Sequence, residues 1–126
     1  MTFELDDSIR DDFLAEAGEL VEKLGGELVE LERRPDDRQL LDSIFRAFHT
    51  IKGGAGFLNV TPLVDVCHAA EEAFDALRKG NLAADAAVMD AVLGALDQTS
   101  AMLAAASAGQ TPEPPIGLTQ FTIPGE

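Results

Sequence analysis

The chain has 126 residues, 46% of them hydrophobic, and a formal net charge of −14 with a pI near 4.3. Nucleic acids and anionic membranes carry phosphate groups that attract basic proteins and repel acidic ones. Because the chain is acidic, we expect neither as a partner. The length suits one domain with its own core, and the absence of a long apolar run or a signal-peptide pattern predicts a cytoplasmic protein.

The first predicted helix covers residues 7–33. Its apolar residues follow the 3.6-residue period of a helix with one buried face: Ile9, Phe13, Ala17, Leu20, Leu24, Leu28 and Leu31. Ser8 and Asp11 have the spacing of a capping box, and Pro35 ends the helix. We interpret Gly25 and Gly26 as a point of close packing against a neighbouring helix.

The second predicted helix begins near Asp36, whose side chain can cap the first turn while Gln39 reaches back, and it ends near Asn59 in a left-handed cap. Its predicted buried stripe is Leu41, Ile44, Phe48, Ile51, Ala55 and Leu58. At 100° per residue, His49 points about 120° away from the mean direction of this stripe. The imidazole is therefore predicted to lie at the edge of the buried face or beyond it, where solvent or a partner can reach it.

The residues that follow His49 are unusual for a helix. Lys52 lies at i+3, close enough for its ammonium group to reach an anion held on the imidazole. Gly53 and Gly56 lie at i+4 and i+7 on the same face, and each glycine costs a helix interior about 1 kcal/mol relative to alanine. We therefore predict that these glycines provide clearance for a bulky group on the ring or for a docking protein.

The third predicted helix covers residues 61–79, with Thr61 as N-cap and Pro62 at the first helical position. Gly80 and Asn81 stop it. Cys67 is the one cysteine of the chain, which excludes an internal disulfide, and it falls on the apolar stripe, so we expect it in the core.

The fourth predicted helix covers residues 84–108 and ends at Gly109. The prolines after Gln110 cannot continue a helix. Four helical patterns with short connections predict an all-α, antiparallel up-and-down four-helix bundle over residues 1–109, followed by a Pro-containing tail or linker over 110–126.

The segment at 45–57 reads Phe-Arg-Ala-Phe-His-Thr-Ile-Lys-Gly-Gly-Ala-Gly-Phe. It resembles the phosphorylation-site helix of histidine phosphotransfer (HPt) domains, in particular the N-terminal domain of the CheA family of chemotaxis histidine kinases. The resemblance implies that His49 takes the γ-phosphoryl group of ATP from a histidine-kinase catalytic domain and passes it to an aspartate of a CheY-like response regulator. The chain would then be a phosphocarrier and no enzyme by itself. It would bind no cofactor, since ATP and Mg²⁺ belong to the kinase domain and Mg²⁺ also to the regulator.

The resemblance also implies roles for residues near His49. His68 and Glu71, at i and i+3 of the third helix, match a histidine and a glutamate that lie beside the phosphorylated histidine in the CheA family. A carboxylate bound to Nδ1–H would leave the lone pair on Nε2, which becomes the nucleophile. Lys52 would offset charge on the phosphoramidate, and His68 would support the site or only satisfy packing.

Phe45 and Arg46, both within one turn of His49, each have two possible roles: contact with a partner protein, or an ordinary place in the core or at the surface. Phe45 lies at i−4, where it either contacts the regulator or packs in the core. Arg46 either helps to bind the partner or faces water. The residues alone do not decide between these roles.

Two other functions compete with phosphotransfer. One is a metal-binding bundle that uses His49, His68 and Glu71, but these offer no clear fourth ligand and lie beside Lys52, so we expect no metal. The other is a non-catalytic helical adaptor in which His49 is incidental. The adaptor predicts that His49→Gln leaves partner binding and signalling intact.

Overall fold

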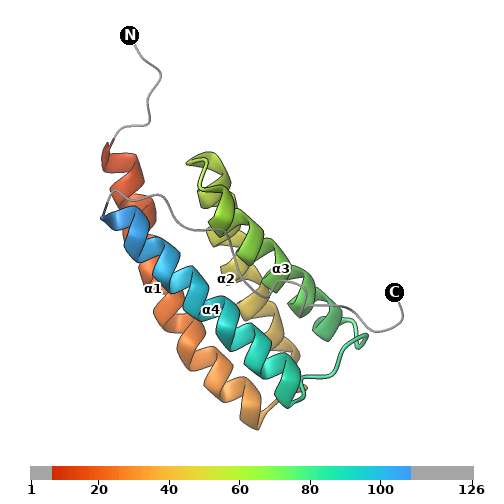
Figure 1. Ribbon diagram of the computed structural model, residues 1–126. Helices are drawn as coiled ribbons and strands as arrows, with labels where there is room; N and C mark the ends of the chain where they lie inside the picture. Colours follow the sequence, from red (N-terminus) through yellow and green to blue (C-terminus); the bar gives the residue numbers. More distant parts are fainter. Residues whose placement is uncertain (1–6, 109–126) are drawn as a thin grey trace.

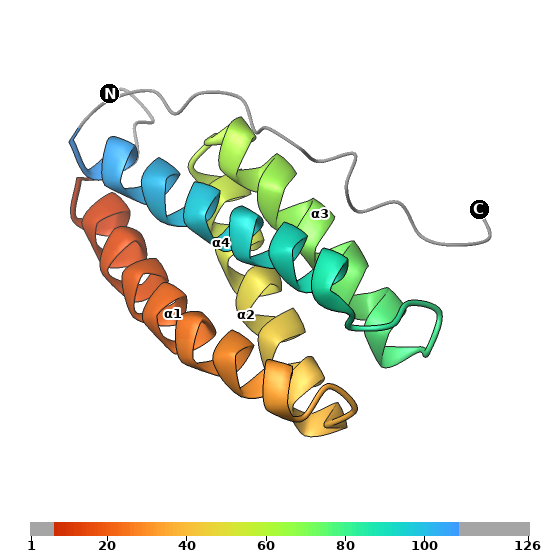
Figure 2. The same ribbon diagram turned by 60° about the horizontal axis from the view of Figure 1, so that its bottom comes forward.

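The computed structural model describes residues 7–108, which form four α-helices joined by short loops. Their bounds are Asp7–Arg33 for α1, Arg38–Phe57 for α2, Thr61–Arg78 for α3 and Ala86–Ser107 for α4. Successive helices run antiparallel, with α1 beside α4 and α2 beside α3 (Figures 1 and 2). The predicted all-α four-helix bundle is confirmed. The predicted tail at 110–126, and Gly109, lie outside the described residues.

The core runs along the middle of the bundle and fixes α2 against α3. Ile44, Phe48 and Ile51 of α2 are fully buried, as the apolar stripe predicts. The ring of Phe48 stacks on that of Phe74 from α3, with centroids 6.0 Å apart and planes 19° apart. Aromatic pairs at this separation attract each other in addition to the area that they bury. Cys67 is also fully buried, and burial raises the pKa of its thiol to about 12.

One glycine of α2 allows α1 to approach closely. A Cβ atom on Gly54 would come within 2.3 Å of the Phe13 ring, so a hydrogen at this position is what lets the ring lie against the helix backbone. At Gly25 and Gly26, nothing lies within 4 Å of the position that a Cβ would occupy. The predicted close packing at Gly25 and Gly26 is therefore wrong, and Gly54 has that role instead.

Helix α1 has the predicted bounds, and the ends of the other three helices differ from the predicted ones by at most two residues. Asp37, not Asp36, caps α2, because its side chain accepts a hydrogen bond of 3.1 Å from the Leu40 amide. Val60 is the N-cap of α3 and makes no side-chain cap bond, so Thr61 is already helical. Helix α4 begins after Asp85, whose carboxylate accepts from the Val88 amide at 3.0 Å.

The turns between helices follow the sequence more closely. Asn59 adopts the predicted left-handed conformation, with φ of 61°, and Gly80 has φ of 78°. At the end of the bundle that carries the α2–α3 turn, the Arg10 guanidinium donates to the Ala106 carbonyl oxygen in the last turn of α4 (Figure 1). This bond joins the first turn of α1 to the last turn of α4.

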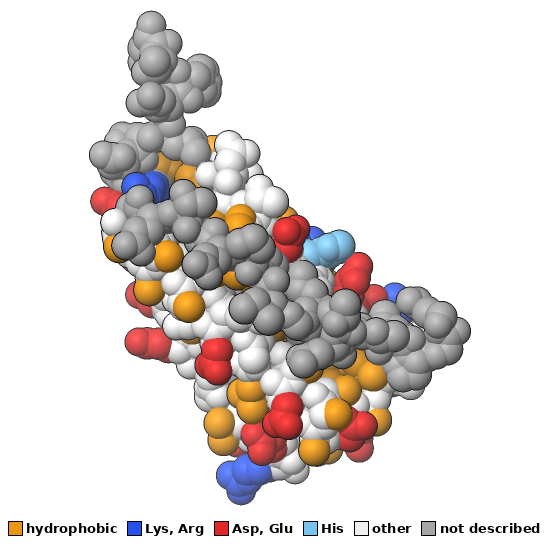
Figure 3. All heavy atoms as spheres, in the orientation of Figure 1, with side chains coloured by type: hydrophobic (Ala, Val, Ile, Leu, Met, Phe, Trp, Pro, Cys, Tyr) orange, Lys and Arg blue, Asp and Glu red, His pale blue; other side chains and the backbone are white. Residues whose placement is uncertain are grey.

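The charged residues of the chain are mainly acidic, with 23 Asp and Glu against 9 Lys and Arg. In the space-filling view Asp and Glu side chains are scattered over the face that is seen (Figure 3). Among helices α1 to α4, none is both long enough and apolar enough to cross a membrane.

Candidate functional site

His49 lies on the exposed side of α2, where the angle from the buried stripe predicts it. Its side chain is 62% exposed, while Phe48, the preceding residue, is fully buried. Histidine side chains reach the surface in Figure 3, with acidic and basic groups beside them. A partner can therefore approach the imidazole without any rearrangement of the bundle.

The imidazole is held from the neighbouring helix by Glu71. Nδ1 of His49 lies 3.2 Å from Oε1 of Glu71, and Nζ of Lys52 lies 2.8 Å from Oε2. The Glu71 side chain is only 14% exposed and the Lys52 side chain 25%. Each oxygen of this largely shielded carboxylate thus faces one nitrogen of α2.

The charge state of Glu71 determines which nitrogen of His49 carries the proton. Burial by itself would raise the pKa of Glu71, but hydrogen bonds from Lys52 and His49 outweigh it and hold the pKa below its ordinary value of 4.5. At neutral pH the group is a carboxylate, which only accepts hydrogen bonds. Nδ1 must therefore donate, and the lone pair of the neutral ring is on Nε2, the nitrogen that makes no contact with Glu71.

Two predicted site residues, Lys52 and His68, pair with carboxylates of α3. The Lys52 ammonium group pairs with the Glu71 carboxylate, so its charge acts on the ring through that group. Nε2 of His68 pairs with Glu72, one turn along α3, at 3.2 Å, and both side chains are more than half exposed. The structure brings Lys52 and Glu71 together with His49 but does not bring His68 into the cluster.

Phe45 is half-buried and contacts the imidazole itself. Its ring centroid lies 6.2 Å from that of His49, with an angle of 11° between the two planes. The guanidinium carbon of Arg78, from the end of α3, lies 4.0 Å from the Phe45 centroid. Sequence reasoning missed Arg78; the one signal was its i+3 spacing from Asp75.

Arg46 lies on the side of α2 that faces α1. It is exposed and lines a shallow hollow of about 220 Å³ together with Leu20 and Lys23 of α1. The two residues of α3 in the cluster, Glu71 and Arg78, do not line this hollow.

The fold does not itself need glycine at the two predicted clearance positions. Nothing lies within 4 Å of a Cβ built on Gly53, and at Gly56 the nearest atom is a Val64 methyl at 3.9 Å, an ordinary contact. The prediction that these glycines leave room for a second molecule stays a prediction.

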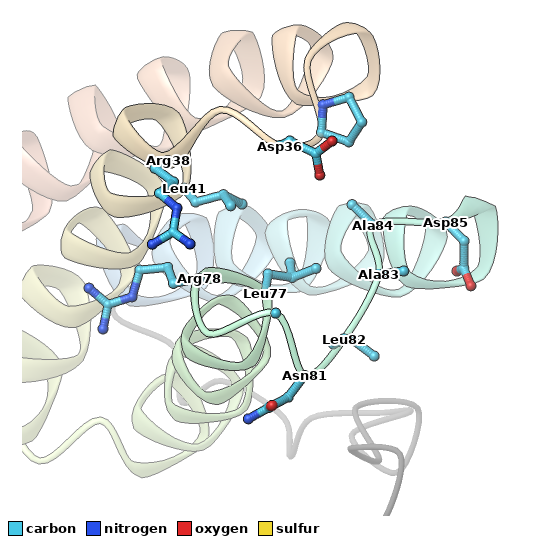
Figure 4. Close-up of a pocket in the computed structure, with 12 residues that line it drawn as sticks. Asp36, Arg38, Leu41, Leu77, Arg78, Asn81, Leu82, Ala83, Ala84 and Asp85 are labelled. Atoms are coloured by element: carbon cyan, nitrogen blue, oxygen red, sulfur yellow. The ribbon is translucent and has the colours of Figure 1, made fainter.

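The larger hollow of the surface lies away from His49. It has a volume of about 770 Å³ and is bounded by the start of α2, the end of α3 and the loop that leads to α4. Leu41 and Leu77 form its apolar base, with Arg38 and Arg78 at one end and Asp85 at the other (Figure 4). Across residues 7–108, no three His, Cys, Asp or Glu side chains are grouped so that they could hold a metal ion.

The chain is similar to known proteins along the part that forms the four helices. Residues 8–108 match the Hpt domain family. The chain is 43% identical over 95 residues to the sensor histidine kinase CheAY of Helicobacter pylori, and 39% identical over 98 residues to the chemotaxis protein CheA of Treponema pallidum. These alignments cover 75% and 78% of the chain but only 12% of each relative.

A solved structure supports the fold in the same way. The solution structure of the histidine phosphotransfer domain of CheA superposes with a TM-score of 0.79 at 25% identity. The match covers 93% of this chain and 88% of that one. The similarity therefore extends through the whole bundle and is not limited to the segment around His49.

Proposed function

Because this chain belongs to the Hpt domain family, we propose that it carries phosphoryl groups from a histidine-kinase catalytic domain to a CheY-like response regulator of a chemotaxis system. His49 is the residue that is phosphorylated. The observation that carries this proposal is the contact between Nδ1 of His49 and Glu71, which leaves Nε2 unprotonated on an exposed side chain.

In the first transfer, Nε2 of neutral His49 attacks the γ-phosphorus of ATP bound to the kinase domain. A P–N bond forms, the bond to the bridging oxygen breaks, and ADP leaves. The Nδ1 proton stays on the ring and remains hydrogen-bonded to Glu71. Glu71 thereby favours the positive charge that develops on the imidazole, and Lys52 keeps the carboxylate ionised and oriented.

In the second transfer, an aspartate oxygen of the regulator attacks the phosphorus and the P–N bond breaks. The electron pair returns to Nε2, so the domain regains its starting state. Mg²⁺ bound by the regulator offsets the charge on the transferred group. ATP and Mg²⁺ are supplied by the partners, which is why we place the reaction in the cytoplasm, where ATP is available.

This domain acts as a carrier and leaves nucleotide binding to another domain. The glycines that follow His49 lie inside α2, whereas a phosphate-binding loop connects a strand to the start of a helix. What α2 offers is a nucleophile on a rigid element.

The proposal is tested by ³²P transfer from ATP in the presence of a CheA-type catalytic domain. Wild-type protein should take up label that is stable in base and labile in acid, and a CheY-like regulator should remove it. His49→Gln should take up none while remaining helical. His68→Gln is the matched control, because His68 is also an exposed histidine but pairs with Glu72, and it should keep the label.

The same assay examines Glu71. Loss of a hydrogen bond to a charged group costs about 1.5 kcal/mol, which corresponds to roughly a tenfold lower rate in Glu71→Ala.

Label that persists in His49→Gln would contradict the proposal. So would a wild-type protein that takes label neither from the kinase domain nor from a phosphorylated regulator, and that result would favour the adaptor.

A further inference from the structure

We propose that Phe45 and Arg78 position the His49 ring for phosphoryl transfer, with Arg78 itself fixed by two aspartates. The inference rests on the proposed function and adds two positioning residues to its site. The His49 side chain is 62% exposed, so few contacts with the bundle hold its imidazole.

The hydrogen bond to Glu71 fixes one atom of the ring and leaves its plane undetermined. With Nδ1 held 3.2 Å from Oε1, the ring can still turn about that contact and swing Nε2 through a range of directions. The Phe45 ring, one turn earlier on α2, lies nearly parallel to the imidazole, 11° apart at 6.2 Å between centroids. This separation is within the range of stacked aromatic pairs, so Phe45 restricts the rotation that Glu71 permits.

Phe45 is in turn held by α3. Its ring packs against the hydrophobic core, and the guanidinium carbon of Arg78 lies 4.0 Å from its centroid. A cation over an aromatic face is attracted by the negative potential of the ring. The Phe45 ring is therefore confined between the core of the bundle and a charged group from a second helix.

Two carboxylates fix Arg78 in turn. Nη1 donates to Asp42 of α2 at 3.1 Å, and Nη2 donates to Asp75 of α3 at 2.7 Å. Hydrogen bonds from Lys79 and Arg78 lower the pKa of Asp75, so this carboxylate stays ionised. The Arg78 side chain extends from α3 toward α2 (Figure 4), which places its guanidinium between the two helices.

These contacts give the imidazole a second support that is independent of Glu71. Transfer requires Nε2 to align with the phosphorus and the leaving oxygen, and a misaligned nucleophile lowers the rate of the bound complex. Removal of this support should therefore lower kcat for phosphorylation and leave KM for the domain unchanged.

The first measurement is the steady-state phosphorylation of the domain by a CheA-type catalytic domain. Phe45→Leu should lower kcat roughly fivefold at unchanged KM, Phe45→Tyr should restore it, and Arg78→Met should lower it roughly threefold. Lys79→Met is the matched control. It also removes a cation from Asp75, at 2.8 Å, but it does not touch Phe45, and it should behave as wild type.

The second measurement is the NMR spectrum of the unphosphorylated domain, which needs no kinase. The carbon-bound ring protons of His49 should carry a ring-current shift that is lost in Phe45→Leu and reduced in Arg78→Met. The His68 protons, on a ring that pairs with Glu72, serve as an internal reference and should not move.

The outcomes separate this inference from the proposed function. A wild-type domain that takes no label from kinase or regulator overturns the proposed function and the positioning role with it. A labelled wild type with unchanged kcat in Phe45→Leu, a change in KM alone, or unchanged His49 protons overturns the positioning role and leaves the proposed function standing.

Discussion

Glu71 shows how one carboxylate can be kept ionised with little access to water. Its side chain is 14% exposed, and an isolated charge in such a place would take up a proton. Two nitrogens of α2 offset the cost of burying this charge. Nζ of Lys52 lies 2.8 Å from one carboxylate oxygen, and Nδ1 of His49 lies 3.2 Å from the other. The proton position on His49 therefore depends on Lys52 as well, although Lys52 is paired with Glu71 and not with the ring.

The lowered pKa of Glu71 makes its contribution to stability dependent on pH. Glu71→Gln should lower the free energy of unfolding by about 1 to 2 kcal/mol near neutral pH, because the amide cannot pair with Lys52 as a carboxylate does. The contribution is complete above the ordinary value of 4.5 and is lost as pH falls through the lower pKa of the folded protein.

Urea unfolding of wild type and Glu71→Gln over a range of pH measures this difference. The two free energies should converge as the solution is acidified below pH 4.5, the ordinary pKa of a glutamate. The comparison between variants cancels the titration of the other carboxylates. If the difference in unfolding free energy between wild type and Glu71→Gln stayed constant at every acidic pH measured, Glu71 would not be held ionised by its neighbours.

At the scale of the helix, two adjacent glycines of α2 have opposite surroundings. Gly54 faces α1, where the Phe13 ring occupies the space that a side chain would need. Gly53 is exposed, with nothing within 4 Å of a built Cβ. The intrinsic cost of glycine in a helix is the same at both positions, so the packing alone distinguishes them.

These surroundings predict opposite effects of the same substitution. Gly54→Ala should destabilise the bundle by about 1 to 3 kcal/mol, because the methyl group forces the Phe13 ring out of its place. Gly53→Ala should stabilise it by up to about 1 kcal/mol, the gain of alanine over glycine in a helix. Thermal unfolding followed by circular dichroism measures both, and a lower Tm for Gly53→Ala than for Gly54→Ala would contradict the assignment.

What the sequence predicts well lies within single helices. The 3.6-residue period gave the buried stripe of α2 and, from it, the exposed direction of His49. The contact with Glu71 came from family resemblance, since a bond between residues 22 apart depends on how α2 and α3 pack. The Arg78–Phe45 contact and the Phe13–Gly54 contact were missed for that reason, because neither leaves a periodic signal in either helix.

The predictions of the N-cap residues of α2 and α3 were wrong for another reason. Asp36 and Asp37 are both good N-caps, and only the backbone path after Pro35 selects Asp37. Thr61-Pro62 fits a helix start, yet the chain leaving the left-handed Asn59 makes Val60 the cap. Such choices between neighbours depend on loop geometry, which the identity of one residue does not determine.

At the scale of the whole molecule, a partner that phosphorylates His49 would have to approach a domain with a net charge of −14. Salt screens the long-range part of this charge beyond about 8 to 10 Å, so the shape of the surface near the ring matters most at contact. Gly53 is exposed and one turn after His49, and a Cβ added there would have no atom of this domain within 4 Å, so we predict that a larger side chain would obstruct an incoming protein.

Gly53→Leu should therefore leave the bundle folded but raise KM for phosphorylation roughly tenfold, equivalent to about 1.4 kcal/mol of lost binding. Gly26→Leu is the matched control, since Gly26 is an exposed glycine on α1, also with nothing within 4 Å of a built Cβ. Equal KM values for the two variants would remove the clearance role from Gly53.

The bond between Nδ1 of His49 and Glu71 crosses from α2 to α3, between residues 22 apart in the chain. The lone pair on Nε2 is thus fixed only where these helices are already packed. A newly made or heat-damaged chain contains the same histidine, but that histidine lacks the reactive tautomer in fixed form. On the proposed function, only correctly folded copies present this tautomer in fixed form, and we expect unfolded copies to accept little phosphoryl label.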